Sequence, residues 1–195
     1  IPGAVFFDID SVSDTSNPLP HMFPEADKFS KEVGKLGISN SERVIAYDGG
    51  SMASAGRVWW MFRAFGHKSV SILDGGSGKW RAENRPLEAD APELVTSQYS
   101  ARFNPGLARS VDDVLSIIES GREQILDARS SGRFTATEPE PREGMRAGHM
   151  PGSFNLHYAD LLAEDGTLRP TEELRACFAT SGVDMDQPIV TSCGS

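Results

Sequence analysis

The sequence predicts an α/β fold that contains two copies of one unit, each a parallel sheet flanked by helices. The first observation is that short apolar segments alternate with helical segments at the spacing of βα units. The second is an internal repeat. Residues 1–5 (IPGAV) align with 150–154 (MPGSF) at an offset of 149 (150 minus 1), and residues 44–48 (VIAYD) align with 189–193 (IVTSC) at an offset of 145 (189 minus 44). Because both matches occur in the same order, the chain holds two copies of one unit.

The expected elements follow from hydrophobic periodicity and from glycines that end helices. In the first half they are a strand over 4–9, a helix over 25–36 ended by Gly37, a strand over 44–47, a helix over 53–65 ended by Gly66 and a strand over 69–73. In the second half they are a helix over 111–119, a strand over 124–127, a long polar loop over 128–149, a helix over 171–178 and a strand over 189–192.

A stretch rich in proline and polar residues, 86–109, interrupts this alternation and predicts a linker. The expected domains are therefore residues 1–88 and 109–195, joined by a linker over 89–108. Each half lacks elements that the other contains, because the second stops just after its cysteine and the first begins at its Pro-Gly element. Both domains are therefore expected to be incomplete, with about 40 residues missing before Ile1 and about 50 after Ser195.

The composition restricts the classes of partner. Lys and Arg total 19 against 28 Asp and Glu, a formal charge of −9, which argues against nucleic acid or an anionic membrane as the main partner. The apolar stretches are too short to span a bilayer. Two cysteines are too few for a disulfide framework and indicate a reducing compartment, hence a cytoplasmic location, or a mitochondrial one in a eukaryote. No Cys/His spacing resembles a zinc site, so we expect no metal.

Cys193 is the candidate nucleophile. It follows the predicted strand over 189–192 and opens a Gly-Ser turn. Ligands of open parallel sheets bind at the carboxyl ends of strands, where loop amides stabilise anions and favour a thiolate. The alternative is that Cys193 is a small buried residue. Cys177 lies in the helix over 171–178 beside Phe178 and is expected to pack in the core.

The segment Cys193-Gly194-Ser195 resembles the start of the active-site loop of tandem-rhodanese sulfurtransferases of the 3-mercaptopyruvate type. The resemblance covers essentially the whole chain, although the Pro-Gly element by itself is a weak signal. The run over 127–152 (DARSSGRFTATEPEPREGMRAGHMPG), together with Cys-Gly-Ser, is its specific part. Further matching stretches are 1–10 (IPGAVFFDID), 57–63 (RVWWMFR) and 73–80 (LDGGSGKW).

The resemblance implies two rhodanese-like domains with different roles. The first would be inactive, because Asp48 stands in place of the cysteine, and the second would be catalytic. Sulfur from 3-mercaptopyruvate would form a persulfide on Cys193 and pass to a thiol such as thioredoxin or to cyanide, releasing pyruvate without any cofactor.

The resemblance also places substrate-binding and proton-transfer residues. Arg133 and Arg142 occupy the positions of the family's two substrate-binding arginines, and Gly194 supplies a loop amide. Guanidinium groups can bind the donor's carboxylate and carbonyl, although loop arginines are often simply solvated. Arg129 and Arg146, in the same segment, are expected to form salt bridges or to lie on the surface.

Asp10, His21 and Ser195 match the family's proposed relay, in which the aspartate orients the histidine and the histidine polarises the hydroxyl. The alternative for His21, which precedes Met22 and Phe23, is a packing role.

Three rivals remain from the sequence. A thiosulfate-preferring rhodanese is disfavoured by Gly194 and Ser195, because such enzymes tend to carry basic residues after the cysteine. A phosphatase or arsenate reductase would place an arginine a few residues after the cysteine, beyond Ser195. The third rival is an inert or binding module, since the cysteine loop is incomplete in this chain.

Overall fold

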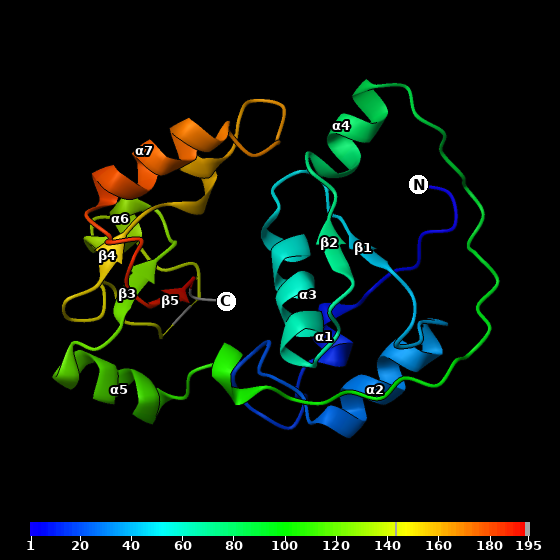
Figure 1. Cartoon of the computed structure of the whole chain (residues 1–195), viewed down its shortest axis with the longest axis horizontal. Helices are drawn as coiled ribbons and strands as arrows, with labels where there is room; N and C mark the ends of the chain where they lie inside the picture. The colour runs from blue at the N-terminus through cyan, green and yellow to red at the C-terminus, as the bar shows by residue number, and fades with distance from the viewer. Residues whose placement is uncertain (143, 194–195) are drawn as a thin grey trace. The chain divides into compact units, whose positions relative to one another are not determined.

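The computed structural model describes residues 1–142 and 144–193 (Figure 1). The chain divides into two compact units. Unit 1 comprises Ile1–Ala108 with Asp165–Thr167, and unit 2 comprises the other described residues from Arg109 onward. Each unit contains parallel strands accompanied by helices, so the predicted α/β class with two parallel sheets is confirmed.

Unit 1 contains a two-stranded parallel sheet whose register pairs Val44 with Val70. Its elements are α1 (Ile9–Val12), α2 (Ala26–Lys35), β1 (Val44–Ala46), α3 (Ala53–Ala64), β2 (Val70–Ile72), α4 (Gly76–Ala82) and the 3-10 helix η1 (Pro105–Leu107). The helices and strands predicted over 25–36, 44–47, 53–65 and 69–73 match α2, β1, α3 and β2 to within one or two residues.

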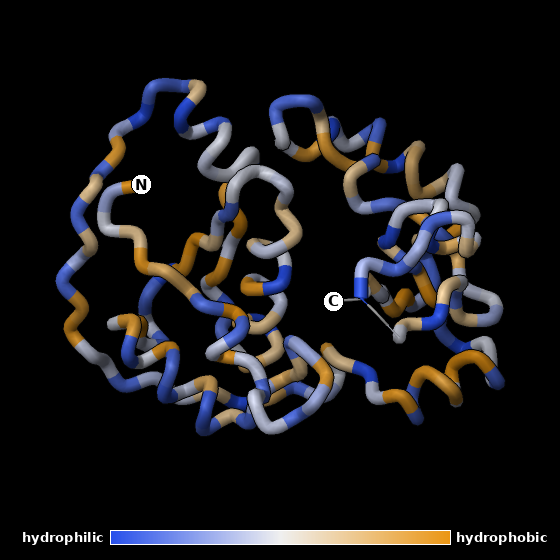
Figure 2. Tube along the Cα trace, turned by 180° about the vertical axis from the view of Figure 1, so that it is seen from behind, coloured by the Kyte–Doolittle hydropathy of each residue, from blue (hydrophilic) through white to orange (hydrophobic). Residues whose placement is uncertain are grey.

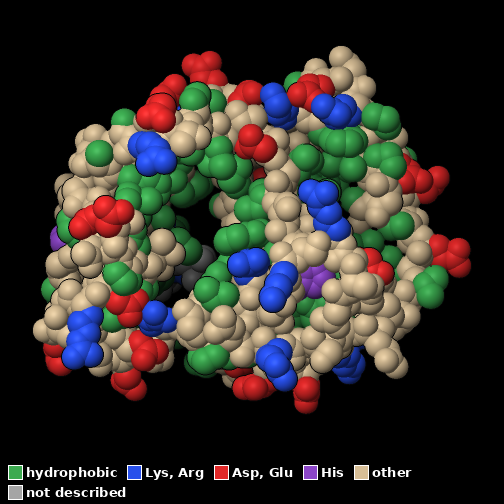
Figure 3. Space-filling view, in the orientation of Figure 1, with side chains coloured by type: hydrophobic (Ala, Val, Ile, Leu, Met, Phe, Trp, Pro, Cys, Tyr) green, Lys and Arg blue, Asp and Glu red, His purple; other side chains and the backbone are tan. Residues whose placement is uncertain are grey.

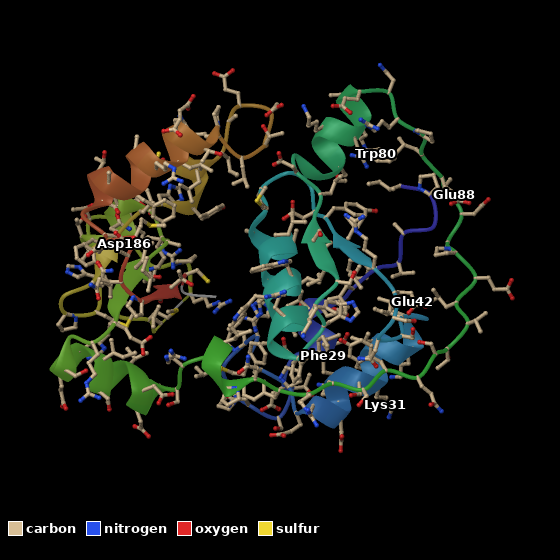
Figure 4. The ribbon with its side chains drawn as sticks, in the orientation of Figure 1. Phe29, Lys31, Glu42, Trp80, Glu88 and Asp186 are labelled. Carbon is tan, nitrogen blue, oxygen red and sulfur yellow. The ribbon has the colours of Figure 1, made fainter. Side chains whose placement is uncertain are left out.

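The core of unit 1 is an aromatic cluster between α2 and α3. Phe29 of α2 is fully buried and its ring stacks on Phe65 at 4.2 Å, while Phe62 meets it edge-on at 5.4 Å. Figure 4 shows Phe29 directed into this interior and Lys31 directed away from it. The i, i+4 spacing of Phe29 and Val33 places both on the buried face of α2, which explains why this segment forms an amphipathic helix.

The strand predicted over 4–9 is wrong. Residues 4–8 form no strand, and Ile9–Val12 form the short helix α1 instead. The side chain of Asp8 caps this helix, because its Oδ1 accepts hydrogen bonds from the amides of Asp10 and Ser11. A strand also requires a neighbour for its backbone groups, and within the described chain no strand pairs with residues 4–8.

Helix α4 was not expected, because the glycines at its start favour a loop. Gly75 precedes it with φ +77°, a conformation that glycine adopts without steric cost, and the helix then continues through Trp80. The indole Nε1 of Trp80 donates to the carbonyl of Pro86 and ties the end of α4 to the segment that follows (Figure 4).

The segment expected to be a linker packs against unit 1. In Figure 1 it follows α4 as a long extended trace that passes α2 and reaches η1. The amide of Ser97 donates to the Gly34 carbonyl at 2.9 Å and that of Arg102 to the Phe65 carbonyl at 3.0 Å. Tyr99 is buried and joins the aromatic core. These contacts explain why unit 1 extends to Ala108.

Unit 2 contains a three-stranded, all-parallel sheet in the order β4-β3-β5. Its elements are α5 (Val111–Ser120), β3 (Gln124–Asp127), α6 (Ser131–Phe134), β4 (Phe154–Asn155), the 3-10 helix η2 (Tyr158–Leu161), α7 (Thr171–Ser181) and β5 (Ile189–Ser192). The predicted helix over 111–119 and both predicted strands are confirmed, and the helix over 171–178 continues to Ser181. The short elements α6 and β4 were not expected, since the polar sequence around them lacks periodicity.

The surfaces of the units carry both apolar and charged side chains. Hydrophobic residues are prominent along α5 in Figure 2, and Val111 and Leu115 are exposed there. Acidic and basic side chains both occur on the face shown in Figure 3. Among the described residues, no helix combines the length and the apolar character that crossing a bilayer requires.

Candidate active site

The candidate site of unit 2 lies at the carboxyl edge of its sheet. The register pairs Asp127, the last residue of β3, with Ser192 of β5 and with Asn155 of β4, so all three strands end at one level. The amide of Ala128 donates to the Ser192 carbonyl at 2.7 Å. Cys193 therefore leaves the sheet beside the start of the segment that carries the arginines. Its side chain is exposed, as a nucleophile requires.

A network of four charged side chains organises this edge. Asp127 is 1% exposed and pairs with Arg129 at 2.6 Å between carboxylate and guanidinium. The Glu140 carboxylate bridges two arginines: Oε1 lies 2.7 Å from Nη1 of Arg129, and Oε2 lies 2.7 Å from Nη2 of Arg133. The Nε of Arg133 also donates to Oε2 at 3.2 Å. Two nitrogens of the Arg133 guanidinium group, Nε and Nη2, therefore donate to the same carboxylate oxygen of Glu140.

Hydrogen bonds and neighbouring charges shift the pKa of two members of this network. Hydrogen bonding to Arg133, and then the charges of Arg133 and Arg129, hold the pKa of Glu140 below its ordinary value. Hydrogen bonding to Asp127 raises the pKa of Arg129. Two carboxylates and two guanidinium groups thus balance, which makes the burial of the Asp127 and Glu140 carboxylates tolerable.

Backbone contacts fix the segment that supports the network. The side-chain Nδ2 of Asn155 donates to the carbonyls of Asp127 and Arg129, both at 2.9 Å. Ser130 caps α6, and its hydroxyl also donates to Glu138 at 2.8 Å. Because these bonds come from β4 and from within the loop itself, they hold the turn that carries Arg133 in place.

The remaining predicted residues of unit 2 are placed as follows. Arg142 lies half-buried in the loop two residues after Glu140. Gly194 and Ser195 lie outside the described residues. Arg129, expected to form a salt bridge or to lie on the surface, forms two ion pairs.

In unit 1 the structure brings Asp10 and His21 together. Nε2 of His21 lies 2.8 Å from Oδ1 of Asp10. The imidazole is partly covered, with 28% of the side chain exposed, whereas Asp10 is 84% exposed. His21 also has φ +58°, which is uncommon for a residue with a Cβ. This contact is the aspartate–histidine part of the predicted relay.

The loop after β1 shows what replaces the cysteine in the first repeat. The Asp48 carboxylate accepts hydrogen bonds from the amides of Gly50 at 2.8 Å, Met52 at 3.1 Å and Ala55 at 3.2 Å. Burial tends to raise the pKa of Asp48, but these amide hydrogen bonds outweigh it and leave the pKa below its ordinary value. The amides that could surround a bound anion are therefore occupied by the chain's own carboxylate.

Sequence reasoning did not single out Glu140 or Asp127 for any role. The signal was present, because Glu138 and Glu140 stand in the run TEPEPR, between Arg133 and Arg142. Which carboxylate would meet which guanidinium depended on the turn at α6, which was not predicted. Within the described part of the chain, no group of three or more His, Cys, Asp or Glu residues could hold a metal ion.

Comparisons with known proteins place this arrangement in a family. The rhodanese-like domain matches residues 1–83 and 110–195. The human 3-mercaptopyruvate sulfurtransferase is 43% identical over 197 residues, covering 100% of this chain and 66% of the relative. The rat thiosulfate sulfurtransferase is 41% identical over 196 residues, covering 99% and 66%. This chain thus spans about two thirds of the length of these curated relatives.

A solved structure with the rhodanese fold also matches this chain. The crystal structure of SseA from Escherichia coli, described as having the rhodanese fold of 3-mercaptopyruvate sulfotransferases, matches with a TM-score of 0.90 and 43% sequence identity. That match covers 99% of this chain and 72% of the other. With two rhodanese-like regions, two parallel sheets and this degree of identity, the chain belongs to the tandem-rhodanese family that includes the 3-mercaptopyruvate sulfurtransferases.

Proposed function

We propose that the protein carrying this chain is a sulfurtransferase that takes sulfur from 3-mercaptopyruvate onto Cys193. The observation that carries the proposal is the position of Cys193, which leaves the same sheet edge as the segment bearing Arg133. The names of relatives at 43% identity support the same activity and donor.

The proposed first half-reaction forms a persulfide. The Cys193 thiolate attacks the sulfur of 3-mercaptopyruvate, a sulfur–sulfur bond forms and the carbon–sulfur bond breaks. The bonding electrons leave with carbon as the enolate of pyruvate, which takes up one proton to become pyruvate. Arg133 and Arg142 would bind the donor's carboxylate and carbonyl, with the loop amide of Gly194 stabilising the charged sulfur.

The proposed proton source is the relay of Asp10, His21 and Ser195. It is supported by the 2.8 Å contact between the carboxylate of Asp10 and the imidazole of His21. Asp10 would orient the ring, and His21 would polarise the Ser195 hydroxyl.

In the second half-reaction a nucleophile attacks the outer sulfur and restores the Cys193 thiolate. A thiol such as reduced thioredoxin, or cyanide, has the required chemistry. Neither half-reaction needs a cofactor. We further propose a cytoplasmic location, because a reactive thiol in a chain with two cysteines suits a reducing compartment.

Thiosulfate is the second candidate donor, because the rat relative at 41% identity is a thiosulfate sulfurtransferase. Thiosulfate lacks a carboxylate and an adjacent carbonyl. The two arginines therefore give a way to separate the donors.

The test combines mass spectrometry of the full-length protein with donor kinetics. After incubation with 3-mercaptopyruvate, the wild type should gain the mass of one sulfur atom on the peptide containing Cys193, and C193S should gain none. C177S is the matched control and should load normally, because Cys177 is placed on α7 with its sulfur near the Asp160 carbonyl. Sulfur loading retained by C193S would refute the nucleophile assignment.

The second part of this test compares both donors in R142M. The Michaelis constant for 3-mercaptopyruvate should rise tenfold or more, on the order of a lost charge-assisted contact, with a smaller change for thiosulfate. Equal effects on both donors would count against the arginine pair as a carboxylate clamp.

A further inference from the structure

Arg57 makes an unusual contact with the backbone of His21. Its Nη2 donates a hydrogen bond to the His21 carbonyl oxygen, across 36 positions of sequence. His21 is one of the few residues other than glycine with positive φ among the described residues, at +58°. That backbone conformation is disfavoured for a residue with a Cβ, so it persists only where surrounding contacts hold it.

Arg57 is itself held rigidly. It belongs to α3, whose neighbouring residue Val58 is in the hydrophobic core. Its guanidinium carbon lies 5.6 Å from the ring centroid of Phe23 and 5.2 Å from that of Trp60. These rings pack edge to face at 4.5 Å, so the cation is placed against two aromatic faces of one cluster.

The direction of the His21 imidazole depends on this backbone. The loop that carries it is closed by a hydrogen bond from the Asp14 amide to the Met22 carbonyl at 2.9 Å. The ring then reaches Asp10 through Nε2 at 2.8 Å. With Nε2 engaged by Asp10, Nδ1 is the nitrogen that would serve the second proton partner of the proposed relay. A rotation of the His21 backbone would move both nitrogens together.

We infer that Arg57 is a positioning residue that holds the backbone of His21 so that its imidazole keeps its place at Asp10. The inference rests on the proposed function, in which His21 and Asp10 relay the proton needed for pyruvate formation. Arg57 acts through His21 and does not contact substrate in this role. The aromatic pair contributes by fixing the guanidinium, which would otherwise adopt many conformations in solvent.

The first experiment measures steady-state turnover of 3-mercaptopyruvate by R57M in the full-length protein. Methionine keeps an apolar chain against the rings and removes the donor and the charge. We expect kcat to fall about tenfold or more with an unchanged KM, because the donor-binding arginines stay in place. R57K, which keeps a cation and a donor, should recover part of kcat. R63M is the matched control on the same helix, since Arg63 is exposed, and should keep wild-type kcat.

The second experiment distinguishes positioning from general support of the fold. R57M is combined with H21A, and kcat is measured for both single variants and the double variant. If Arg57 acts through His21, R57M should cost nothing further once the imidazole is gone. An equal fold-loss in both backgrounds, or wild-type kcat in R57M, would overturn the inference. Wild-type turnover in H21A would instead overturn the relay in the proposed function, so the two failures are distinguishable.

Discussion

At the scale of single residues, the candidate site depends on carboxylates that hold guanidinium groups. Glu140 contacts both Arg129 and Arg133, and Asp127 contacts Arg129. Glu140 therefore orients Arg133, and in the proposed function this orientation would lower the entropy cost of binding an anionic donor.

Replacing Glu140 by glutamine should loosen Arg133 and destabilise unit 2. The amide cannot supply the negative charge that balances two guanidinium groups, so we expect a higher KM for 3-mercaptopyruvate and a lower melting temperature at neutral pH. E138Q is the matched control, because Glu138 accepts from the Ser130 hydroxyl rather than from a guanidinium. It should change both quantities far less. Equal effects of the two substitutions would contradict the bridging role.

The same pair of proteins makes a pH prediction. The pKa of Glu140 is lowered below its ordinary 4.5, so the unfolded chain takes up a proton at higher pH than the folded one. Its stabilising contribution is complete above about 4.5 and disappears as pH falls through the lowered value. The difference in unfolding free energy between wild type and E140Q should thus stay constant from about pH 7 to about pH 5 and shrink as the pH falls below about 4.5. A constant difference in denaturant titrations would show that the charge is irrelevant.

The carboxylate of Asp48 occupies the backbone amides of its own loop, where an external anion could otherwise bind. D48N should lower the free energy of unfolding by about 1–2 kcal/mol, because hydrogen bonds from three amides lose their charged acceptor. Sulfur loading of Cys193 should stay at the wild-type level. Asp90, in the exposed segment after α4, offers D90N as control, with no measurable change expected in chemical denaturation. A D48N protein as stable as wild type would argue against the amide contacts.

At the scale of elements, the helices differ in what lies against their glycines. Gly34 of α2 faces the segment over 94–104, and a Cβ there would meet the Ser97 carbonyl oxygen at 2.7 Å. Gly56 of α3 has nothing within 4 Å of its Cβ position. The close approach at Gly34 lets the Ser97 amide bond directly to the Gly34 carbonyl.

The two glycines predict opposite effects of one substitution. G56A should stabilise the protein by roughly 0.5–1 kcal/mol, because alanine restricts the unfolded chain and favours helix. G34A should destabilise it despite the same gain in propensity, because backbone atoms would have to move apart. Hydrogen exchange at the Ser97 amide should accelerate in G34A alone. If G34A stabilised the protein and left hydrogen exchange at the Ser97 amide unchanged, the close packing of residues 94–104 on α2 would be contradicted.

The same element scale explains the failed strand prediction. Residues 4–9 have the β-branched and aromatic composition of a strand, yet Asp8 starts a helical turn and no strand pairs with residues 4–8 in the described chain. In unit 2 the aligned residues Phe154–Asn155 do form β4, because β3 lies beside them. Strand formation therefore depended on a neighbour rather than on local composition.

At the scale of the whole molecule, the two copies of the repeat differ in the residue that follows their aligned strands. The strands that align in the two halves are β1 in unit 1 and β5 in unit 2. In unit 1 the loop after β1 closes on Asp48, and in unit 2 the strand leads to Cys193. We therefore assign sulfur chemistry to unit 2, as the proposed function requires.

Periodicity and the repeat in the sequence by themselves determined the α/β class, the two copies, α2, α3, α5 and the strands β3 and β5. The position of Cys193 after a predicted strand made it a candidate nucleophile, whereas Arg133 and the Asp10–His21 pair were singled out by the resemblance to the rhodanese sulfurtransferases. These features are local, or follow from repeated short patterns. Only the tertiary structure decided that Glu140 bridges two arginines, that His21 adopts a left-handed backbone held by Arg57, and that residues 94–104 pack on α2. Each of these depends on which distant groups meet in space, and propensity along the chain carries no information about that.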